Sequence, residues 1–267
     1  MRFSEKAAQN LMAIRNTKPL IHNITNFVAM NFSANALLSM GASPVMAHAH
    51  NEVEEMVALS GSLVLNIGTL TDEWVSAMIK AGKRANDLNI PVILDPVGSG
   101  ATSFRTASAK KILAATAVSV IRGNPSEIIS LSDQSSITKG VDSVHTVEDA
   151  FQPATSLALE LGTTLAITGP KDLITNGKKI VRVDNGHPLM GRVTGTGCVA
   201  TAITGAFLAV DPDPVRASAT ALSFFGLAGE IAAQSASAPG SFMAALLDSL
   251  YRITPEMLEK GCRIVEE

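Results

Sequence analysis

Residues 191–205 carry the pattern in this sequence that is best suited to holding an anion. They read Gly-Arg-Val-Thr-Gly-Thr-Gly-Cys-Val-Ala-Thr-Ala-Ile-Thr-Gly, so Gly195 and Gly197 stand just before a run of small and apolar residues. Glycine permits a sharp turn and lets a ligand approach the backbone amides. A buried helix that begins there would turn free N–H groups and its positive dipole end toward an anion. The pattern indicates either an anion hole made by Gly195, Thr196, Gly197 and Cys198, or an ordinary glycine-rich turn before a core helix.

Cys198 falls in the first turn of this expected helix. A thiol at a helix N-terminus tends to lose its proton more easily, so we expect a lowered pKa and a side chain that faces the chemistry. The alternative is a small, buried, apolar residue. The sequence indicates no nearby histidine or asparagine partner for a covalent nucleophile, which favours a role in positioning a hydroxyl group.

A second group of candidate residues follows the ends of expected strands. Short apolar runs alternate with helical patterns along the whole chain, and this alternation predicts a mostly parallel sheet with helices on both faces. Ligands bind such sheets at the carboxyl ends of the strands. The polar, small or flexible residues expected at these ends are Asn26, Met46, Gly68, Asp95, Arg122 and Thr168.

Asp95 and Glu127 are the candidate metal ligands. Asp95 ends an apolar strand before Pro-Val-Gly-Ser-Gly, and Glu127 lies three residues after Asn124 at the start of a helix. Two carboxylates at one sheet edge suit Mg²⁺, held directly or through water. Asp95 can equally cap the glycine loop, and Glu127 can equally form a capping box with Asn124.

Arg122 and Thr168 are the candidate phosphate contacts, because a guanidinium fork and a hydroxyl both donate hydrogen bonds. A plain surface arginine is the alternative. Together with the glycine loop and the carboxylates, they suit phosphoryl transfer, which needs positioning, a metal and donors that stabilise charge. The sequence has neither a Gly-x-x-x-x-Gly-Lys-Ser/Thr loop nor a Gly-x-Gly-x-x-Gly after its first expected strand.

Composition narrows the class of protein. The chain has 267 residues, 46% of them hydrophobic, and a formal net charge of −3. No linker or shift in composition divides it, so we expect a single domain over residues 1–267, with a polar loop at 132–146. The charge argues against nucleic acid as a partner. Two cysteines, no signal peptide and no long apolar stretch predict a cytoplasmic protein without a membrane span.

The chain resembles the hydroxyethylthiazole kinases of thiamine salvage, within the ribokinase-like superfamily. The segments that carry the resemblance span most of the chain in order and are His22–Asn26, Gly41–Met46, Leu65–Leu70, Leu94–Gly98, Arg122–Glu127, Ile167–Gly169 and Gly195–Cys198. The resemblance implies a three-layer α/β/α fold and ATP-dependent phosphorylation of the hydroxyl of 4-methyl-5-(2-hydroxyethyl)thiazole, with Mg²⁺. It also implies a homotrimer with active sites between subunits.

The resemblance further implies roles for individual residues. Asn26, Met46, Gly68 and Gly195 would line the thiazole pocket, and Arg122 and Thr168 would contact ATP. Asp95 and Glu127 would organise the metal, and the amides of Gly195, Thr196, Gly197 and Cys198 would form the anion hole. The wider superfamily usually carries Asp where Cys198 stands, and this difference weakens the assignment of a catalytic base.

Three alternatives remain at the level of sequence. One is a kinase for another small alcohol, such as a hydroxymethylpyrimidine. Another is an ADP-dependent dehydratase of hydrated NAD(P)H. Relatives of both kinds usually carry Asp at the position of Cys198. The last is a thiazole-binding regulatory protein without activity, whose expected sign is loss of Asp95, Glu127 or the glycines, all of which are present.

Overall fold

The computed structural model describes residues 2–132 and 146–267. Most of the expected polar loop at 132–146 therefore lies outside the described residues. The chain alternates between strands and helices up to β6, as its apolar pattern predicts. These first strands are β1 (Leu20–Ile24), β2 (Ser43–Val45), β3 (Ser62–Asn66), β4 (Val92–Asp95), β5 (Val120–Gly123) and β6 (Thr164–Ile167). The later strands are β7 (Asp172–Thr175), β8 (Ile180–Val183) and β9 (Ile264–Glu266).

In the described part of the chain these strands form one nine-stranded sheet in the order β2-β1-β3-β4-β5-β6-β7-β8-β9. The pairs from β2 through β6 are parallel, and those from β6 through β9 are antiparallel. The expected mostly parallel sheet is thus confirmed. Asn66 pairs in register with Asp95, and Leu94 pairs with Ile121, the residue before Arg122. Polar residues from three strands therefore meet at one edge.

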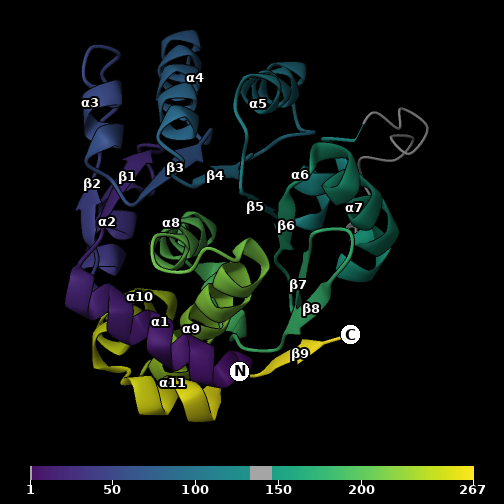
Figure 1. Cartoon of the computed structure of the whole chain (residues 1–267). Coiled ribbons are helices and arrows are strands. Elements are labelled where there is room, and N and C mark those ends of the chain that lie inside the picture. Colours follow the sequence, from purple (N-terminus) through teal and green to yellow (C-terminus); the bar gives the residue numbers. More distant parts are fainter. Residues whose placement is uncertain (1, 133–145) are drawn as a thin grey trace.

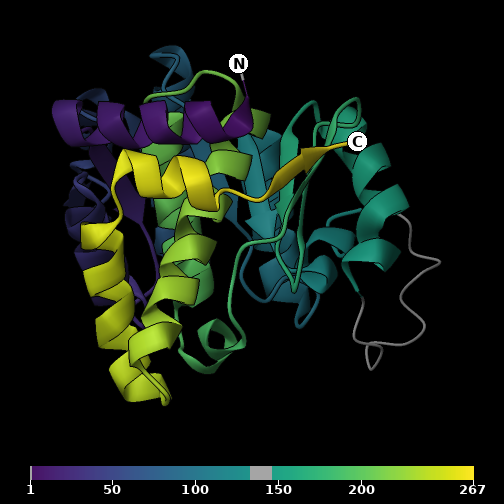
Figure 2. The same ribbon diagram turned by 90° about the horizontal axis from the view of Figure 1, so that it is seen from below.

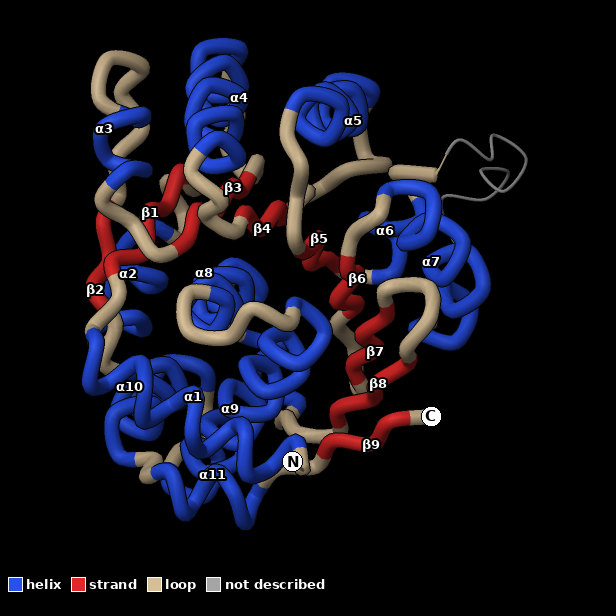
Figure 3. Tube along the Cα trace, viewed as in Figure 1, coloured by secondary structure: helices blue, strands red, loops and turns tan. Residues whose placement is uncertain are grey.

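Helices cover both faces of the sheet, as expected (Figures 1 and 3). The sheet curves around α8, and α9 lies beside that helix. The helices on this concave side are α1 (Phe3–Thr17), α2 (Met30–Met40), α8 (Thr196–Leu208), α9 (Pro214–Ser235), α10 (Pro239–Arg252) and α11 (Pro255–Gly261). The helices on the other face are α3 (Val53–Ala58), α4 (Asp72–Asp87), α5 (Ser103–Ala115), α6 (Pro125–Ile129) and α7 (Val147–Leu161).

Each face of the sheet has its own apolar core. On the concave side every residue of α8 from Val199 to Leu208 is buried, so this helix is surrounded by protein beyond its first turn. A helix that is apolar or small on all sides can be stable only in such an environment. Its N-terminal turn is therefore held rigidly at the carboxyl edge of the strands. No helix among the described residues is both long and apolar enough to cross a bilayer.

The structure differs from the sequence-based expectation at the C-terminus. Residues 264–266 form β9, which pairs with β8 at the edge of the sheet and was not expected. In the turned view α11 runs alongside α1, and β9 extends beyond the N-terminal end of α1, so the two ends of the chain lie on the same side of the molecule (Figure 2). Asn176 and Gly177 lie in the turn between β7 and β8, which pair as an antiparallel hairpin.

Candidate active site

The N-terminus of α8 is shaped by Gly195. This residue precedes the helix with φ of 84° in the left-handed region, and its N-cap position has no side-chain hydrogen bond. Left-handed backbone favours glycine, which has no Cβ. The Thr196 hydroxyl donates to the carbonyls of Met190 at 2.9 Å and Val193 at 3.0 Å, so it anchors the preceding loop. The first amides of the helix have no partner within the helix and remain available to an anion.

Arg122 lies directly against this turn. Its Nη2 donates a hydrogen bond to the Thr168 hydroxyl, which joins the two expected phosphate contacts. A Cβ atom at Gly197 would stand only 2.8 Å from Arg122 Nη1. Glycine is therefore required at this position if the guanidinium is to pack against the helix terminus. Three separate segments thus converge on one positively charged surface.

Asp95 is buried beside this surface. Its Oδ2 accepts hydrogen bonds from Asn66 Nδ2 at 2.8 Å and from the Thr201 hydroxyl at 2.7 Å, and lies 4.0 Å from Arg122 Nη1. Its Oδ1 is buried without a hydrogen-bond partner among the described residues. Burial raises the pKa of Asp95 to about 6, and nearby Glu127 also raises it, against the opposing effects of Arg122 and the two hydrogen bonds.

Glu127 adopts the capping role that its spacing allowed. Its Oε2 accepts from the backbone N–H of Asn124 at 2.8 Å, and the Glu127 N–H donates to the Asn124 side chain at 2.9 Å, which completes a capping box. Its Oε1 accepts from the Gly98 N–H at 2.9 Å and so ties α6 to the loop after β4. Each carboxylate oxygen keeps a free lone pair, so capping and metal binding are compatible.

The described residues contain no group of three or more His, Cys, Asp or Glu side chains arranged to hold a metal. Mg²⁺ usually keeps several waters and needs only one or two protein carboxylates together with substrate phosphates. The unpartnered Asp95 Oδ1 is the kind of buried acceptor that such an ion, or one of its waters, would satisfy. The residues present therefore fit Mg²⁺.

A chain of amides joins Asp95 to Cys198, so the expectation that Cys198 has no nearby asparagine is wrong. Asn26 Nδ2 donates to Cys198 Sγ at 3.2 Å and to Asn66 Oδ1 at 2.7 Å, and Asn66 in turn donates to Asp95. Gly68 also belongs here, since its N–H donates to Asn66 Oδ1 and a Cβ atom there would meet Asn26 at 2.7 Å. The structure thus brings together three of the four expected thiazole contacts, counting Gly195 at the start of α8.

Met46 is placed less directly. It follows β2, the edge strand beside β1, and is half-buried. Met46 lies at the carboxyl edge as expected. The strands β1 and β2 are parallel, His22 pairs with Val45, and Met46 follows Val45 directly. A partly exposed methionine at this edge can form one wall of a pocket for an apolar ring.

The expected lowering of the Cys198 pKa is wrong. Burial raises the pKa of this thiol, and the neighbouring Asp95 carboxylate raises it further, although hydrogen bonds from Asn26 and Asn66 and the charge of Arg122 oppose them. The expectation considered only the helix N-terminus. Desolvation of the thiolate and a nearby negative charge come from tertiary packing, and both favour the protonated thiol. Cys198 is therefore a neutral thiol at physiological pH.

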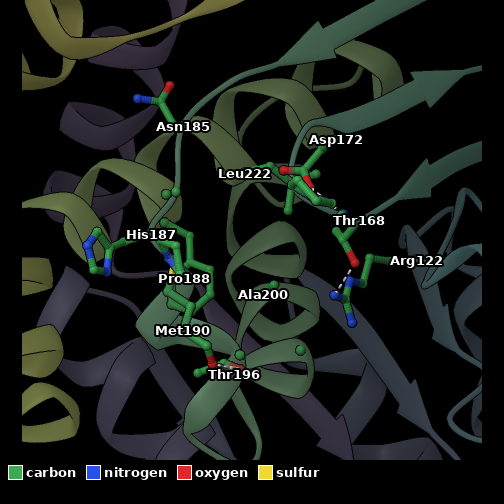
Figure 4. A pocket seen from close by; sticks show the side chains of 17 residues that line it. Arg122, Thr168, Asp172, Asn185, His187, Pro188, Met190, Thr196, Ala200 and Leu222 are labelled. Carbon is green, nitrogen blue, oxygen red and sulfur yellow. Dashed lines mark hydrogen bonds between the residues drawn. The ribbon is translucent and has the colours of Figure 1, made fainter. Parts of the chain in front are cut away.

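A cavity of about 490 Å³ opens on the other side of the α8 terminus (Figure 4). Arg122, Thr168 and Asp172 line one wall, and Pro188 and Met190 face them from the loop before α8. Leu222 and Phe225 of α9 complete its apolar part. The volume lies within the range of about 300–1,000 Å³ that is usual for small-molecule sites.

Three residues that hold the site together did not emerge from the sequence as site residues. Asn66 and Thr201 fix the Asp95 carboxylate, and Asn66 could have been found because it ends a strand as Asp95 does. Arg105 of α5 donates to the carbonyls of Ile67 at 3.0 Å, Val97 at 2.8 Å and Gly68 at 2.8 Å. It ties together the loops after β3 and β4, and no local pattern around Arg105 indicates this.

Known proteins are similar to this chain over nearly its whole length. A hydroxyethylthiazole kinase of Desulfotalea psychrophila is 67% identical over 264 residues, covering 99% of this chain and 97% of the relative. The structure of the hydroxyethylthiazole kinase from Pyrococcus horikoshii superposes with a TM-score of 0.90 at 45% identity, covering 98% and 99% of the two chains.

More distant structures share the fold alone. A ribokinase-like superfamily protein from Enterococcus faecalis superposes with a TM-score of 0.63 at 14% identity, covering 93% of this chain and 89% of that one. The expected ribokinase-like architecture is thereby confirmed. The model of the hydroxyethylthiazole kinase family matches residues 11–256. The chain therefore belongs to the hydroxyethylthiazole kinase family.

Proposed function

We propose that the protein transfers the γ-phosphoryl group of ATP to the hydroxyl of 4-methyl-5-(2-hydroxyethyl)thiazole, as a step of thiamine salvage. The observation that carries this proposal is the position of the α8 N-terminus. It lies between the Asn26–Cys198 contact on one side and the cavity beside Arg122 and Thr168 on the other. An acceptor hydroxyl and a nucleotide bound on these two sides would meet at Gly195–Cys198.

On the nucleotide side, the chain supplies charge stabilisation. The amides of Thr196, Gly197 and Cys198 and the Arg122 guanidinium would donate to the oxygens of the transferring phosphoryl group. Phosphoryl transfer has a loose transition state with charge spread over these oxygens, so fixed donors contribute most of the catalysis. The packing of α8 keeps the donors in place, and little reorganisation is needed when the charge develops.

On the acceptor side, the chain would position the hydroxyl. Asn26 fixes the Cys198 thiol, which can exchange a weak hydrogen bond with the substrate oxygen. A thiol with a raised pKa is a poor proton acceptor at neutral pH. A loose transition state needs little help from a base. We therefore assign Cys198 a positioning role, and Gly68 and Met46 the walls around the thiazole ring.

Asp95 and Glu127 would hold Mg²⁺, directly or through its waters. An ion bound there would supply positive charge that neutralises part of the charge on the phosphates. Asn66 and Thr201 donate hydrogen bonds to Asp95 Oδ2 and leave Oδ1 without a partner among the described residues. These hydrogen bonds fix the orientation of the carboxylate in the metal-free protein. Such support is expected to raise metal affinity.

We also propose a homotrimer with active sites between subunits. Phe27, Val28 and Leu38 are 65%, 63% and 60% exposed, and Phe27 follows Asn26 directly. Large exposed apolar side chains beside a site favour coverage by a partner. Leu38→Glu is expected to yield smaller particles in sedimentation and to lose turnover. Met12→Glu, which changes an exposed methionine of α1, serves as the control. A trimer that persists in Leu38→Glu contradicts this placement of the interface.

The decisive experiment measures ADP release with the thiazole alcohol and Mg-ATP in a coupled assay. Turnover that depends on the thiazole alcohol is the expected result. A panel containing hydroxymethylpyrimidine and hydrated NADH is measured in parallel, and preference for either of these would overturn the assignment. Calorimetric binding of the thiazole alcohol without ADP release would indicate a binding protein instead.

The two free thiols, Cys198 and Cys262, agree with a cytoplasmic location.

A further inference from the structure

Asp172 is a buried carboxylate that the proposed chemistry does not use. It is the first residue of β7 and is only 8% exposed, yet it lines the cavity beside Thr168. In Figure 4 its side chain lies on the same wall as Arg122 and Thr168, opposite Pro188 and Met190. An acidic group in the wall of a cavity that receives a polyphosphate needs an explanation, because two negative charges at short range repel each other.

One oxygen of this carboxylate is occupied and the other is not. Oδ1 accepts a hydrogen bond from the Gly169 N–H at 3.0 Å, which fixes the orientation of the group. Within residues 2–132 and 146–267 this is the only hydrogen bond to the Asp172 side chain. The Arg122 guanidinium acts on the carboxyl only through its charge. The second oxygen is therefore available to a donor on a bound molecule.

The other polar side chains of the cavity are already engaged. The Asn185 amide donates to Glu230 and to the Gly261 carbonyl, and its oxygen accepts from Ser223 and from the Arg263 N–H. The Thr168 and Thr196 hydroxyls are used by Arg122 and by the loop before α8. The His187 ring points away from the cavity and faces Phe242. The Thr168 and Thr196 hydroxyls keep neutral lone pairs, whereas Asp172 offers a free carboxylate oxygen, which is the stronger acceptor.

A bound nucleotide contains a group that can donate a hydrogen bond to the free oxygen of Asp172. Its phosphates suit the donors at Arg122 and the α8 terminus, and its flat base suits the apolar surface of Pro188, Leu222 and Phe225. The group that joins phosphates to base is a ribose, which carries two hydroxyl donors. We propose, on the basis of the ATP-dependent function above, that Asp172 accepts a hydrogen bond from a ribose hydroxyl and so makes the enzyme prefer ribonucleotides.

The test compares the binding of Mg-ATP, 2′-deoxy-ATP and 3′-deoxy-ATP by calorimetry, with the thiazole kinase assay run on the same samples. A hydrogen bond to a charged group is stronger than one between neutral groups, so we expect at least one deoxynucleotide to bind about tenfold or more weakly to the wild type. In Asp172→Ala all three nucleotides are expected to bind within about twofold of one another, since the acceptor is gone.

Two further variants keep the test decisive. Asp172→Asn can still accept the Gly169 N–H, but its neutral amide replaces a charge-assisted hydrogen bond to the ribose with a weaker one, so it should reduce the same preference even if the alanine variant does not fold. Asp184→Asn removes an exposed carboxylate just after β8, outside the cavity, and should keep the wild-type preference.

The outcomes are distinct. An unchanged ribose preference in both Asp172 variants overturns the inference. Uniformly weaker binding of all three nucleotides, with the preference retained, assigns Asp172 only to the Gly169 turn and also overturns it. Turnover of the thiazole alcohol by the wild type without ribose preference refutes this inference alone. Absence of both turnover and ATP binding refutes the proposed function itself.

Discussion

Gly197→Ala is the substitution with the clearest expected effect on catalysis. The new Cβ would lie 2.8 Å from Arg122 Nη1, whereas ordinary contacts begin at about 3.4 Å, so the guanidinium must move by about 0.6 Å. Arg122 can move because only its side-chain end is in the way. The backbone of α8 needs no change, and alanine favours a helix by about 1 kcal/mol over glycine. We therefore expect a folded protein in which Arg122, the proposed phosphate contact, is displaced.

The expected loss follows from that displacement. A charge-assisted hydrogen bond to a phosphate contributes about 1.5–3 kcal/mol, which corresponds to roughly 10- to 100-fold in kcat/KM. The assay is coupled ADP release with the thiazole alcohol and Mg-ATP. Gly240→Ala is the matched control, because a Cβ atom there would meet no atom within 4 Å. Its kcat/KM should equal that of the wild type.

A double-mutant cycle identifies the cause. If Gly197→Ala acts by moving Arg122, it should change kcat/KM by less than about twofold in an Arg122→Ala background, since the group to be displaced is absent. Wild-type kcat/KM in Gly197→Ala would refute the proposed packing of Arg122 against the α8 terminus. A full effect that persists without Arg122 would show that the methyl group acts on the anion hole directly.

Gly68→Ala should raise the KM for the thiazole alcohol at least about tenfold and leave the KM for ATP unchanged, because its Cβ would lie 2.7–2.8 Å from Asn26 atoms; equal changes in both KM values would contradict this. Burial raises the pKa of Asp172 from 3.8 to about 7, so the folded protein binds more protons than the unfolded chain between these pH values and its free energy of unfolding falls as pH rises through this window. Asp172→Asn lacks this titration. In urea unfolding, the free energy of unfolding of the variant minus that of the wild type should therefore increase by a few kcal/mol from pH 4 to 8. A difference that stays constant with pH would refute the raised pKa of Asp172. Chelation by EDTA should abolish ADP release without changing the circular dichroism spectrum, since Asp95 is held by protein hydrogen bonds, and Mg²⁺ should restore activity; full activity in EDTA would exclude the metal role.

The position of the site could be predicted from the sequence because it depends on local patterns. The alternation of apolar runs with helical segments implies a parallel sheet, and polar residues after such runs must lie at its carboxyl edge. Asn66, Asp95 and Arg122 meet there through the strand register alone. The need for glycine at Gly195 also follows from a local property, its left-handed backbone. These predictions need only the position at which each strand ends and the residues that follow it in the sequence.

Properties that depend on packing could not be obtained in this way. Cys198 illustrates the difference, because its local position at a helix terminus predicts a lowered pKa, whereas burial and Asp95 raise it. The electrostatic environment of a group is the sum over neighbours from distant segments, and their number and distance appear only when the chain has folded.

The sequence by itself determined the fold class, the sheet edge that carries the site and the residues available for phosphoryl transfer. Tertiary structure alone decided how those residues are arranged: Arg122 fits against the helix because Gly197 has no side chain, Arg105 joins two loops, and Asp172 lines the cavity beside Thr168. The physical reason is range. Backbone preferences act over a few neighbouring residues, whereas burial, charge and close contact act between residues far apart in the chain.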